Sequence, residues 1–150
     1  MRNIINTYLG YILVFLMALM TLAVLWGVFT RYAIGSQADW SEELARFLLI
    51  WIGMLGAAYA SGQHKHLAID LLFPKLSPDN QRRLIVFINL LITVFAFAVL
   101  VVGGFRLMYI TQVLGQLSAA LRVPMFLVYA VLPVSGLLVM YFKVSDLQSA

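Results

Sequence analysis

The chain has 150 residues, of which 63% are hydrophobic and only 11% are charged, and it contains no cysteine. This composition excludes a water-soluble domain, because such domains are close to half apolar and a quarter charged. The lack of cysteine excludes disulfides, thiolate metal sites and cysteine nucleophiles. The net charge of +4 is better explained by membrane topology than by nucleic acid, so no nucleic-acid partner is expected.

Four apolar stretches fill most of the chain and predict four transmembrane helices. About 20 consecutive apolar residues cross a bilayer as a helix. The expected spans are 7–30, 41–62, 84–106 and 123–143. The first stretch is longer than the apolar core of a cleavable signal peptide, so we expect it to remain as a helix. The predicted fold is an all-α integral membrane protein, in which residues 1–150 form one domain of four transmembrane helices with short interfacial helical segments.

The start of the second span carries the densest group of charges beside any apolar stretch. Asp39 followed by Glu42 fits a capping box, which would satisfy free N–H groups at the helix start. Glu42 and Glu43 lie four and three residues before Arg46, so both carboxylates can reach its guanidinium on one helix face. The cluster either caps the helix at the membrane surface or docks a partner. Spacing alone favours the first interpretation, because such pairs are routine at helix starts.

The second span also carries a stripe of small residues. Gly53 and Ala57 are four residues apart, as are Gly56 and Ala60. This small-xxx-small pattern lets helices pack closely in membranes. The stripe either contacts another protein or packs within the chain's own four helices, and the sequence supports the second interpretation at least as well.

The connection after the second span predicts an interfacial helix rather than a metal site. Residues 67–76 are too short to cross the membrane and carry Asp70, so we expect a helix lying along the interface. His64 and His66 lie just before it. A closed metal site usually needs three or four ligands, so no metal or other cofactor is expected. No nucleophile accompanies these histidines, and the chain is not expected to be an enzyme.

The second half of the chain carries few polar signals. Residues 106–122 are expected to extend the third helix and then bend along the outer surface, with Gly115 as a breaker. Asn89 is predicted to form a hydrogen bond with another helix, and Pro133 is predicted to kink the fourth helix.

The positive charges predict the orientation. With four spans, both termini lie on one side of the membrane, together with the 62–83 loop. That side holds six of the ten Lys and Arg residues. Because positive charge near span ends favours the cytoplasm, the termini and this loop are predicted to be cytoplasmic.

No Asp, Glu, Lys or Arg lies near the centre of any expected span. Carriers coupled to protons or ions generally keep ionisable groups there, so the chain is not expected to move a solute by itself. A self-sufficient small homo-oligomeric transporter remains the alternative, although the missing membrane carboxylate argues against it. A haem bundle is excluded, because the two histidines share one loop.

Three blocks of sequence carry a family resemblance. They are Trp-Ser-Glu-Glu-Leu-Ala-Arg-Phe at 40–47, Trp-Ile-Gly-Met-Leu-Gly-Ala-Ala at 51–58, and His-Leu-Ala-Ile-Asp at 66–70. Together with Phe-Thr-Arg-Tyr at 29–32 and the four-span layout, they resemble the small membrane subunit of tripartite ATP-independent periplasmic (TRAP) transporters, the DctQ-like family.

The resemblance implies a role in the bacterial inner membrane. In this family a periplasmic binding protein delivers a carboxylate solute, such as a C4-dicarboxylate, sialic acid or another sugar or keto acid, to a large sodium-coupled multi-span subunit. The small subunit packs against that subunit as a scaffold, in contact with membrane lipid, and here the two are expected to be separate chains. Residues at the periplasmic end of the second helix would be structural and interface residues, and the His…Asp block would belong to the cytoplasmic interfacial segment. The candidate residues are Trp40, Ser41, Glu42, Glu43, Arg46, Gly53, Gly56, Ala57, His66 and Asp70.

Overall fold

The computed structural model describes residues 2–36, 38–63 and 78–149. The described elements are α1 (Arg2–Ala33), α2 (Asp39–Gly62), α4 (Pro78–Phe95), the π-helix η2 (Ala96–Gly103), α5 (Gly104–Val113), α6 (Met125–Tyr129) and α7 (Val131–Ser149).

Four segments are helical, long and apolar enough to cross a membrane, which confirms the predicted fold class. They are Ile4–Ala33, Asp39–Gly62, Arg83–Val113 and Met125–Asp146. The third combines α4, η2 and α5 into one continuous rod, and the fourth combines α6 with most of α7. The predicted interfacial helix at 67–76 lies outside the described residues.

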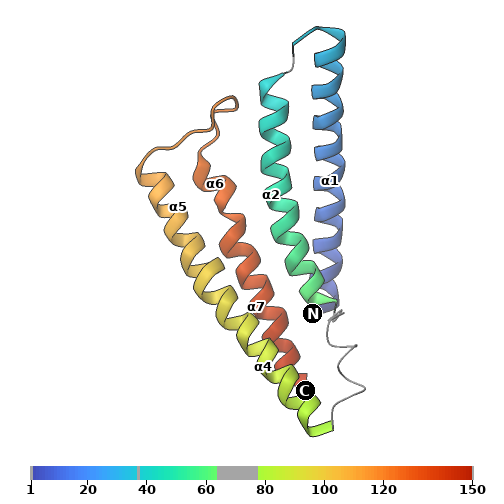
Figure 1. The fold of residues 1–150 in the computed structure, drawn as a ribbon, viewed down its shortest axis with the longest axis vertical. Coiled ribbons are helices and arrows are strands. Elements are labelled where there is room, and N and C mark those ends of the chain that lie inside the picture. The colour runs from blue at the N-terminus through green and yellow to red at the C-terminus, as the bar shows by residue number, and fades with distance from the viewer. Residues whose placement is uncertain (1, 37, 64–77, 150) are drawn as a thin grey trace.

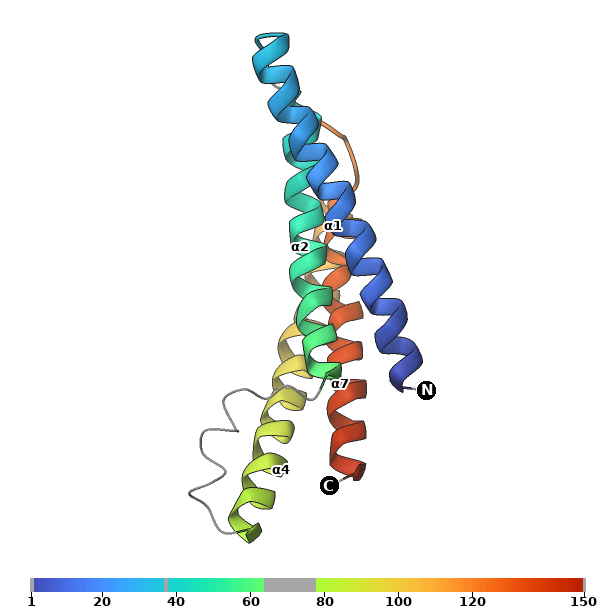
Figure 2. The same ribbon diagram turned by 90° about the vertical axis from the view of Figure 1, so that its right-hand side faces the viewer.

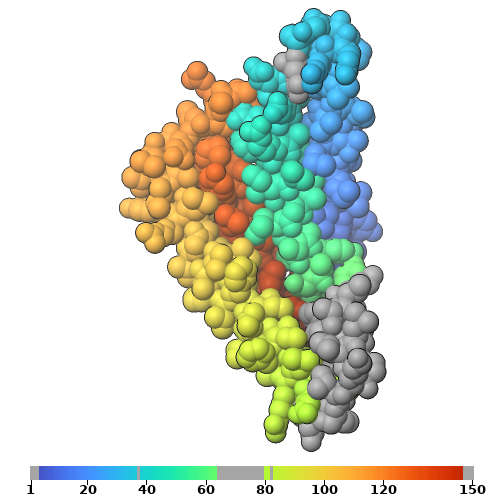
Figure 3. Space-filling model, viewed as in Figure 1, coloured from blue at the N-terminus to red at the C-terminus, as the bar shows by residue number. Residues whose placement is uncertain are grey.

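The spans lie side by side in an order that differs from their order in the chain. α1 packs chiefly against α2, α2 against α7, and α7 against the third-span rod (Figure 1). Figure 3 shows α2 and the rod flanking α7 on one face. Both termini lie at the same end, as the turned view also shows (Figure 2), and the connections that follow α1 and α5 lie at the other. This arrangement leaves much of each helix uncovered.

The packed centre is small and draws one residue from each span. Leu9, Ala58, Ala96 and Val139 form a buried apolar cluster. Large apolar side chains elsewhere stay exposed, among them Phe15 at 66% of its surface. In a membrane protein such surface contacts lipid or another subunit, because neither requires a polar exterior.

Glycines allow α7 to approach the third span closely. A Cβ atom on Gly136 would lie 2.8 Å from Leu100 Cβ, and one on Gly104 would lie 2.8 Å from Pro133 Cδ. Both distances are shorter than carbon–carbon van der Waals contact, which is about 3.5–4.0 Å. Only glycine fits at either position without movement of the neighbouring helix.

Pro133 interrupts the fourth span, in agreement with the predicted kink. The helix breaks between α6 and α7 at Ala130. Proline has no N–H to donate to the carbonyl oxygen four residues earlier, which belongs to Tyr129. The break therefore lies where the helical hydrogen-bond ladder is missing a donor.

Candidate partner-binding surface

The second helix begins differently from the predicted capping box. Its N-cap is Ala38, which is extended and supplies no side-chain cap. Asp39 is already the first helical residue, so its carboxylate is not in the N-cap position. The carbonyl of Ala38 instead accepts hydrogen bonds from the Ser41 N–H at 3.0 Å and the Ser41 hydroxyl at 2.7 Å. Ser41 is 1% exposed, so it closes the helix start from the buried side.

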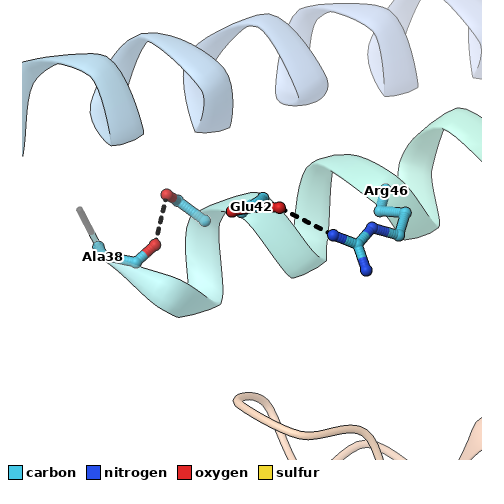
Figure 4. A network of polar contacts seen from close by, with 4 residues as sticks. Ala38, Glu42 and Arg46 are labelled. Carbon is cyan, nitrogen blue, oxygen red and sulfur yellow. Dashed lines mark hydrogen bonds and ion pairs between the residues drawn. The ribbon is translucent and has the colours of Figure 1, made fainter. Parts of the chain in front are cut away.

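Glu42 and Arg46 form the predicted pair along the exposed surface of α2. Arg46 donates to Glu42 Oε1 at 2.8 Å, and the two side chains are 66% and 59% exposed. Figure 4 shows this pair on α2, with Ala38 at the start of the helix. An exposed pair of this kind contributes only about 0.3–0.5 kcal/mol to helix stability. Its charges are therefore available to a partner at little cost to folding.

Glu43 does not join Arg46, which corrects the prediction that both acids share the guanidinium. Its carboxylate accepts three consecutive backbone hydrogen bonds from the connection that follows α5. The donors are the N–H groups of Ala119 at 2.9 Å and of Ala120 and Leu121 at 2.8 Å each. Glu43 thus attaches this connection to the first turns of α2.

The connection that follows α5 doubles back on itself rather than simply bending along the surface. Ser118 N–H donates to the Val123 carbonyl at 2.9 Å, and Val123 N–H donates to the Ser118 hydroxyl at 3.1 Å. Gly115 and Arg122 both have positive φ, at 59° and 53°. Glycine adopts that conformation freely, so Gly115 marks the end of the helix as the sequence suggested. The three N–H groups that donate hydrogen bonds to Glu43 lie at the tip of this narrow loop.

The small-residue stripe of α2 faces away from the other described helices. A Cβ atom on Gly53 or Gly56 would meet no described atom within 4 Å. Ala57 is exposed, whereas the opposite face of the helix buries Leu48 and Leu55. The stripe therefore does not pack against another helix in the described part of the chain.

The charged pair and the small residues share one face of α2. Positions 42, 46, 49, 53, 56 and 60 follow each other at alternating spacings of four and three. Residues at this spacing line one side of a helix. We call the surface formed by Glu42, Arg46, Leu49, Gly53, Gly56, Ala57 and Ala60 the α2 outer face.

The remaining candidate residues fall into two groups. Trp40 is 42% exposed at the start of α2, where an aromatic side chain suits the membrane–water interface. His66 and Asp70 lie outside the described residues. Among the residues that the structure describes, no group of three His, Cys, Asp or Glu side chains could hold a metal ion.

Sequence reasoning missed a buried ion pair near the end of the fourth span. Lys143 Nζ lies 3.8 Å from Asp146 Oδ2, and their side chains are 1% and 7% exposed. From the sequence, Lys143 was only one of the six Lys and Arg residues predicted to lie on the cytoplasmic side. Its spacing of three residues from Asp146 on a helix was the available signal.

Comparison with known proteins agrees with this architecture. The model of the DctQ component of tripartite ATP-independent periplasmic transporters matches residues 20–149. The chain is 31% identical over 103 residues to the sialic acid TRAP transporter small permease protein SiaQ of Vibrio cholerae, covering 69% of this chain and 60% of SiaQ. It is 25% identical over 142 residues to the ectoine TRAP transporter small permease protein TeaB of Halomonas elongata, covering 91% and 70%.

A third relative is a longer permease. The isethionate TRAP transporter permease protein DctMQ of Oleidesulfovibrio alaskensis is 29% identical over 123 residues, which cover 82% of this chain and 19% of DctMQ. The chain spans half of a related Haemophilus influenzae protein and 60% of SiaQ. Four helices able to cross a membrane and the match over residues 20–149 show that the chain is a multi-pass inner membrane protein and belongs to the DctQ component family of TRAP transporters, a family of transporter subunits and not of enzymes.

Proposed function

We propose that this chain is the small subunit of a TRAP transporter, and that it supports a large permease subunit as a fixed scaffold during sodium-driven uptake of a carboxylate solute. The observation that carries the proposal is the open arrangement of its four spans. Each helix keeps a broad apolar surface, as expected when a larger membrane partner covers part of it. Charged residues lie towards the ends of the described spans, which suits a scaffold better than a carrier.

The relatives support a large permease as the partner. In DctMQ, the segment that resembles this chain forms only 19% of a single permease protein. In the sialic acid TRAP transporter permease protein SiaT of Haemophilus influenzae, a 71-residue match forms 11% of the protein. Two such relatives favour a function in which the small-permease segment works beside a much larger one.

The α2 outer face is the proposed contact surface for that permease. Gly53 and Gly56 leave room for a partner helix to approach the α2 backbone closely. The Glu42–Arg46 pair lies at one end of the same face, where it can meet polar groups of the partner. Trp40, Ser41 and Glu43 then act as structural residues that fix the start of α2 and the loop beside it.

The names of the relatives support a proposal for the solute, and the charge distribution supports one for the orientation. The relatives' names give sialic acid, ectoine and C4-dicarboxylate, each of which carries a carboxylate, and isethionate, which carries a sulfonate. We assign this chain to the uptake of a small carboxylate solute delivered by a periplasmic binding protein. The positive-inside rule favours a cytoplasmic location for both termini and a periplasmic location for the Glu43-bound loop.

Affinity purification of the tagged chain from its native membranes in a gentle detergent tests the proposal. Mass spectrometry is expected to find a large multi-span protein in stoichiometric amount. A chain recovered alone, or only with copies of itself, would contradict the scaffold function and favour a small homo-oligomeric transporter.

Charge reversal at Arg46 tests the contact surface. Arg46→Glu is expected to reduce recovery of the large protein, because a third acid would join Glu42 and Glu43 in the first turns of α2. The fold itself should persist, since the exposed pair contributes only about 0.3–0.5 kcal/mol. Arg106→Glu, at an exposed position on α5, is the matched control and should leave recovery unchanged. Full recovery of the large protein with Arg46→Glu would show that Arg46 is not part of the contact surface.

A further inference from the structure

A groove of about 360 Å³ runs between α1 and α2 next to the connection that joins them. This volume lies within the roughly 300–1,000 Å³ typical of small-molecule sites. The groove is not enclosed, so a molecule can enter it from its surroundings. Nothing in the proposed scaffold function requires it.

Small residues on both helices create the space. Ala23 and Gly27 of α1 face Ser41 and Ala45 of α2 across the groove. Ala23 is 5% exposed and Ser41 is 1% exposed, so the floor belongs to the helix–helix contact. The floor is therefore mainly apolar.

The mouth of the groove is charged, in contrast to its floor. Arg31, Tyr32 and Glu42 line it, in the last turn of α1 and the first turns of α2. Tyr32 is 83% exposed and Trp40 lies nearby in the sequence at 42%. Aromatic side chains at the ends of spans mark the membrane–water interface. The mouth thus lies at the level of lipid headgroups, and the floor extends towards the hydrocarbon.

The two signs of charge at the mouth define the occupant. The Arg31 guanidinium can bind a phosphate through two parallel hydrogen bonds. Glu42 uses Oε1 for Arg46, and its second carboxylate oxygen can accept from an ammonium group. A molecule that fits must carry a phosphate and an amine at one end and a flexible apolar chain at the other.

We propose that this groove binds one molecule of phosphatidylethanolamine from the adjacent leaflet. Its phosphate binds Arg31, its ammonium binds Glu42, and an acyl chain lies along Ala23, Gly27 and Ala45. Phosphatidylglycerol supplies the phosphate and the acyl chain but no cation for Glu42, so it binds less well. Binding fills the cleft between α1 and α2 and stabilises their packing.

Native mass spectrometry of the detergent-purified chain, titrated with phosphatidylethanolamine and separately with phosphatidylglycerol, tests the proposal. The wild-type chain is expected to bind one phosphatidylethanolamine saturably, with an affinity at least about tenfold higher than for phosphatidylglycerol, as expected for one charge-assisted hydrogen bond. Arg31→Gln is expected to weaken this binding about tenfold. Arg106→Gln removes an exposed arginine that does not line the groove and should change nothing.

A second variant tests the groove without altering charge. Ala45→Leu fills the floor and is expected to abolish the single-site binding. Equal binding by the wild-type chain, Arg31→Gln and Ala45→Leu would overturn the site, and so would equal affinity for the two lipids. If Ala45→Leu instead releases the large permease while lipid binding stays unchanged, the groove holds a partner helix and the lipid proposal is wrong. A negative lipid result would not affect the proposed scaffold function, because affinity purification of the permease complex tests that function independently.

Discussion

Replacing Gly136 with alanine perturbs a close contact between α7 and η2. The new Cβ atom would lie 2.8 Å from Leu100 Cβ, 3.0 Å from Val101 Cγ2 and 3.3 Å from the Ala96 carbonyl oxygen. All three atoms belong to η2. α7 has to move away from η2, and the buried cluster between them has to loosen.

Two opposing free-energy terms set the size of the effect. Overpacking of a well-packed core costs about 1–3 kcal/mol. Replacing glycine by alanine within a helix stabilises it by about 1 kcal/mol. Gly136→Ala is therefore expected to lower the free energy of unfolding by about 0–2 kcal/mol.

Gly53→Ala is the matched control, because it makes the same change at a helical position that is not packed. Apart from the α2 backbone itself, no described atom lies within 4 Å of the new methyl group. It is expected to raise the free energy of unfolding by about 1 kcal/mol. The difference between the two variants, about 1–3 kcal/mol, isolates the packing cost at the α7–η2 contact.

The assay is equilibrium unfolding of the purified chain in mixed micelles of mild detergent and sodium dodecyl sulfate, followed by circular dichroism. Gly104→Ala, whose Cβ would lie 2.8 Å from Pro133 Cδ, is expected to behave like Gly136→Ala. Equal stability of Gly136→Ala and Gly53→Ala would refute the close approach of α7 to the third span.

Three further predictions concern polar groups. Glu43→Ala removes the acceptor of three loop N–H groups, so hydrogen–deuterium exchange of those amides should accelerate at least about tenfold, whereas Glu42→Ala should leave it unchanged. Lys143→Met removes the buried Lys143–Asp146 ion pair and should lower the free energy of unfolding by about 1–3 kcal/mol in the same assay, with part of that loss recovered when Asp146→Leu is added. His66→Ala should leave metal content unchanged in elemental analysis of the purified protein, and loss of a stoichiometric metal would contradict the prediction that His66 binds no metal.

The positions of the four spans could be predicted from the sequence, because a membrane helix is recognised by its length and apolarity, which are local properties. The same holds for the Glu42–Arg46 pair, since a spacing of four residues defines neighbours on a helix. The break before α7 also followed from one local fact, the missing N–H of Pro133.

Contacts between distant segments could not be predicted in this way. Glu43 and Ala119 are 76 residues apart, and no pattern in the loop indicates that its N–H groups converge on a carboxylate. The π-helical winding of Ala96–Gly103 leaves no mark in a uniformly apolar stretch. Gly136 is informative only once its neighbour across the helix contact is known.

The small-residue stripe of α2 predicts close helix packing, but only the structure shows which neighbours its face has. Gly53 and Gly56 predict close packing, but the sequence does not state whether the neighbour belongs to the same chain. The structure places α7 and α1 against the opposite side of α2, so the described helices leave the stripe open. That result turned an ambiguous motif into a proposed docking surface.

Cysteine cross-linking in native membranes tests whether the α2 outer face contacts a large permease. The chain has no cysteine, so a single Ala57→Cys on the α2 outer face gives a defined reactive position, and Leu91→Cys, which is exposed on α4, gives the comparison. A short thiol-to-amine cross-linker is expected to join the Ala57→Cys chain to a large multi-span permease in high yield, and the Leu91→Cys chain much less. A permease adduct from Leu91→Cys alone, or adducts only between copies of this chain, would contradict a permease contact at the α2 outer face.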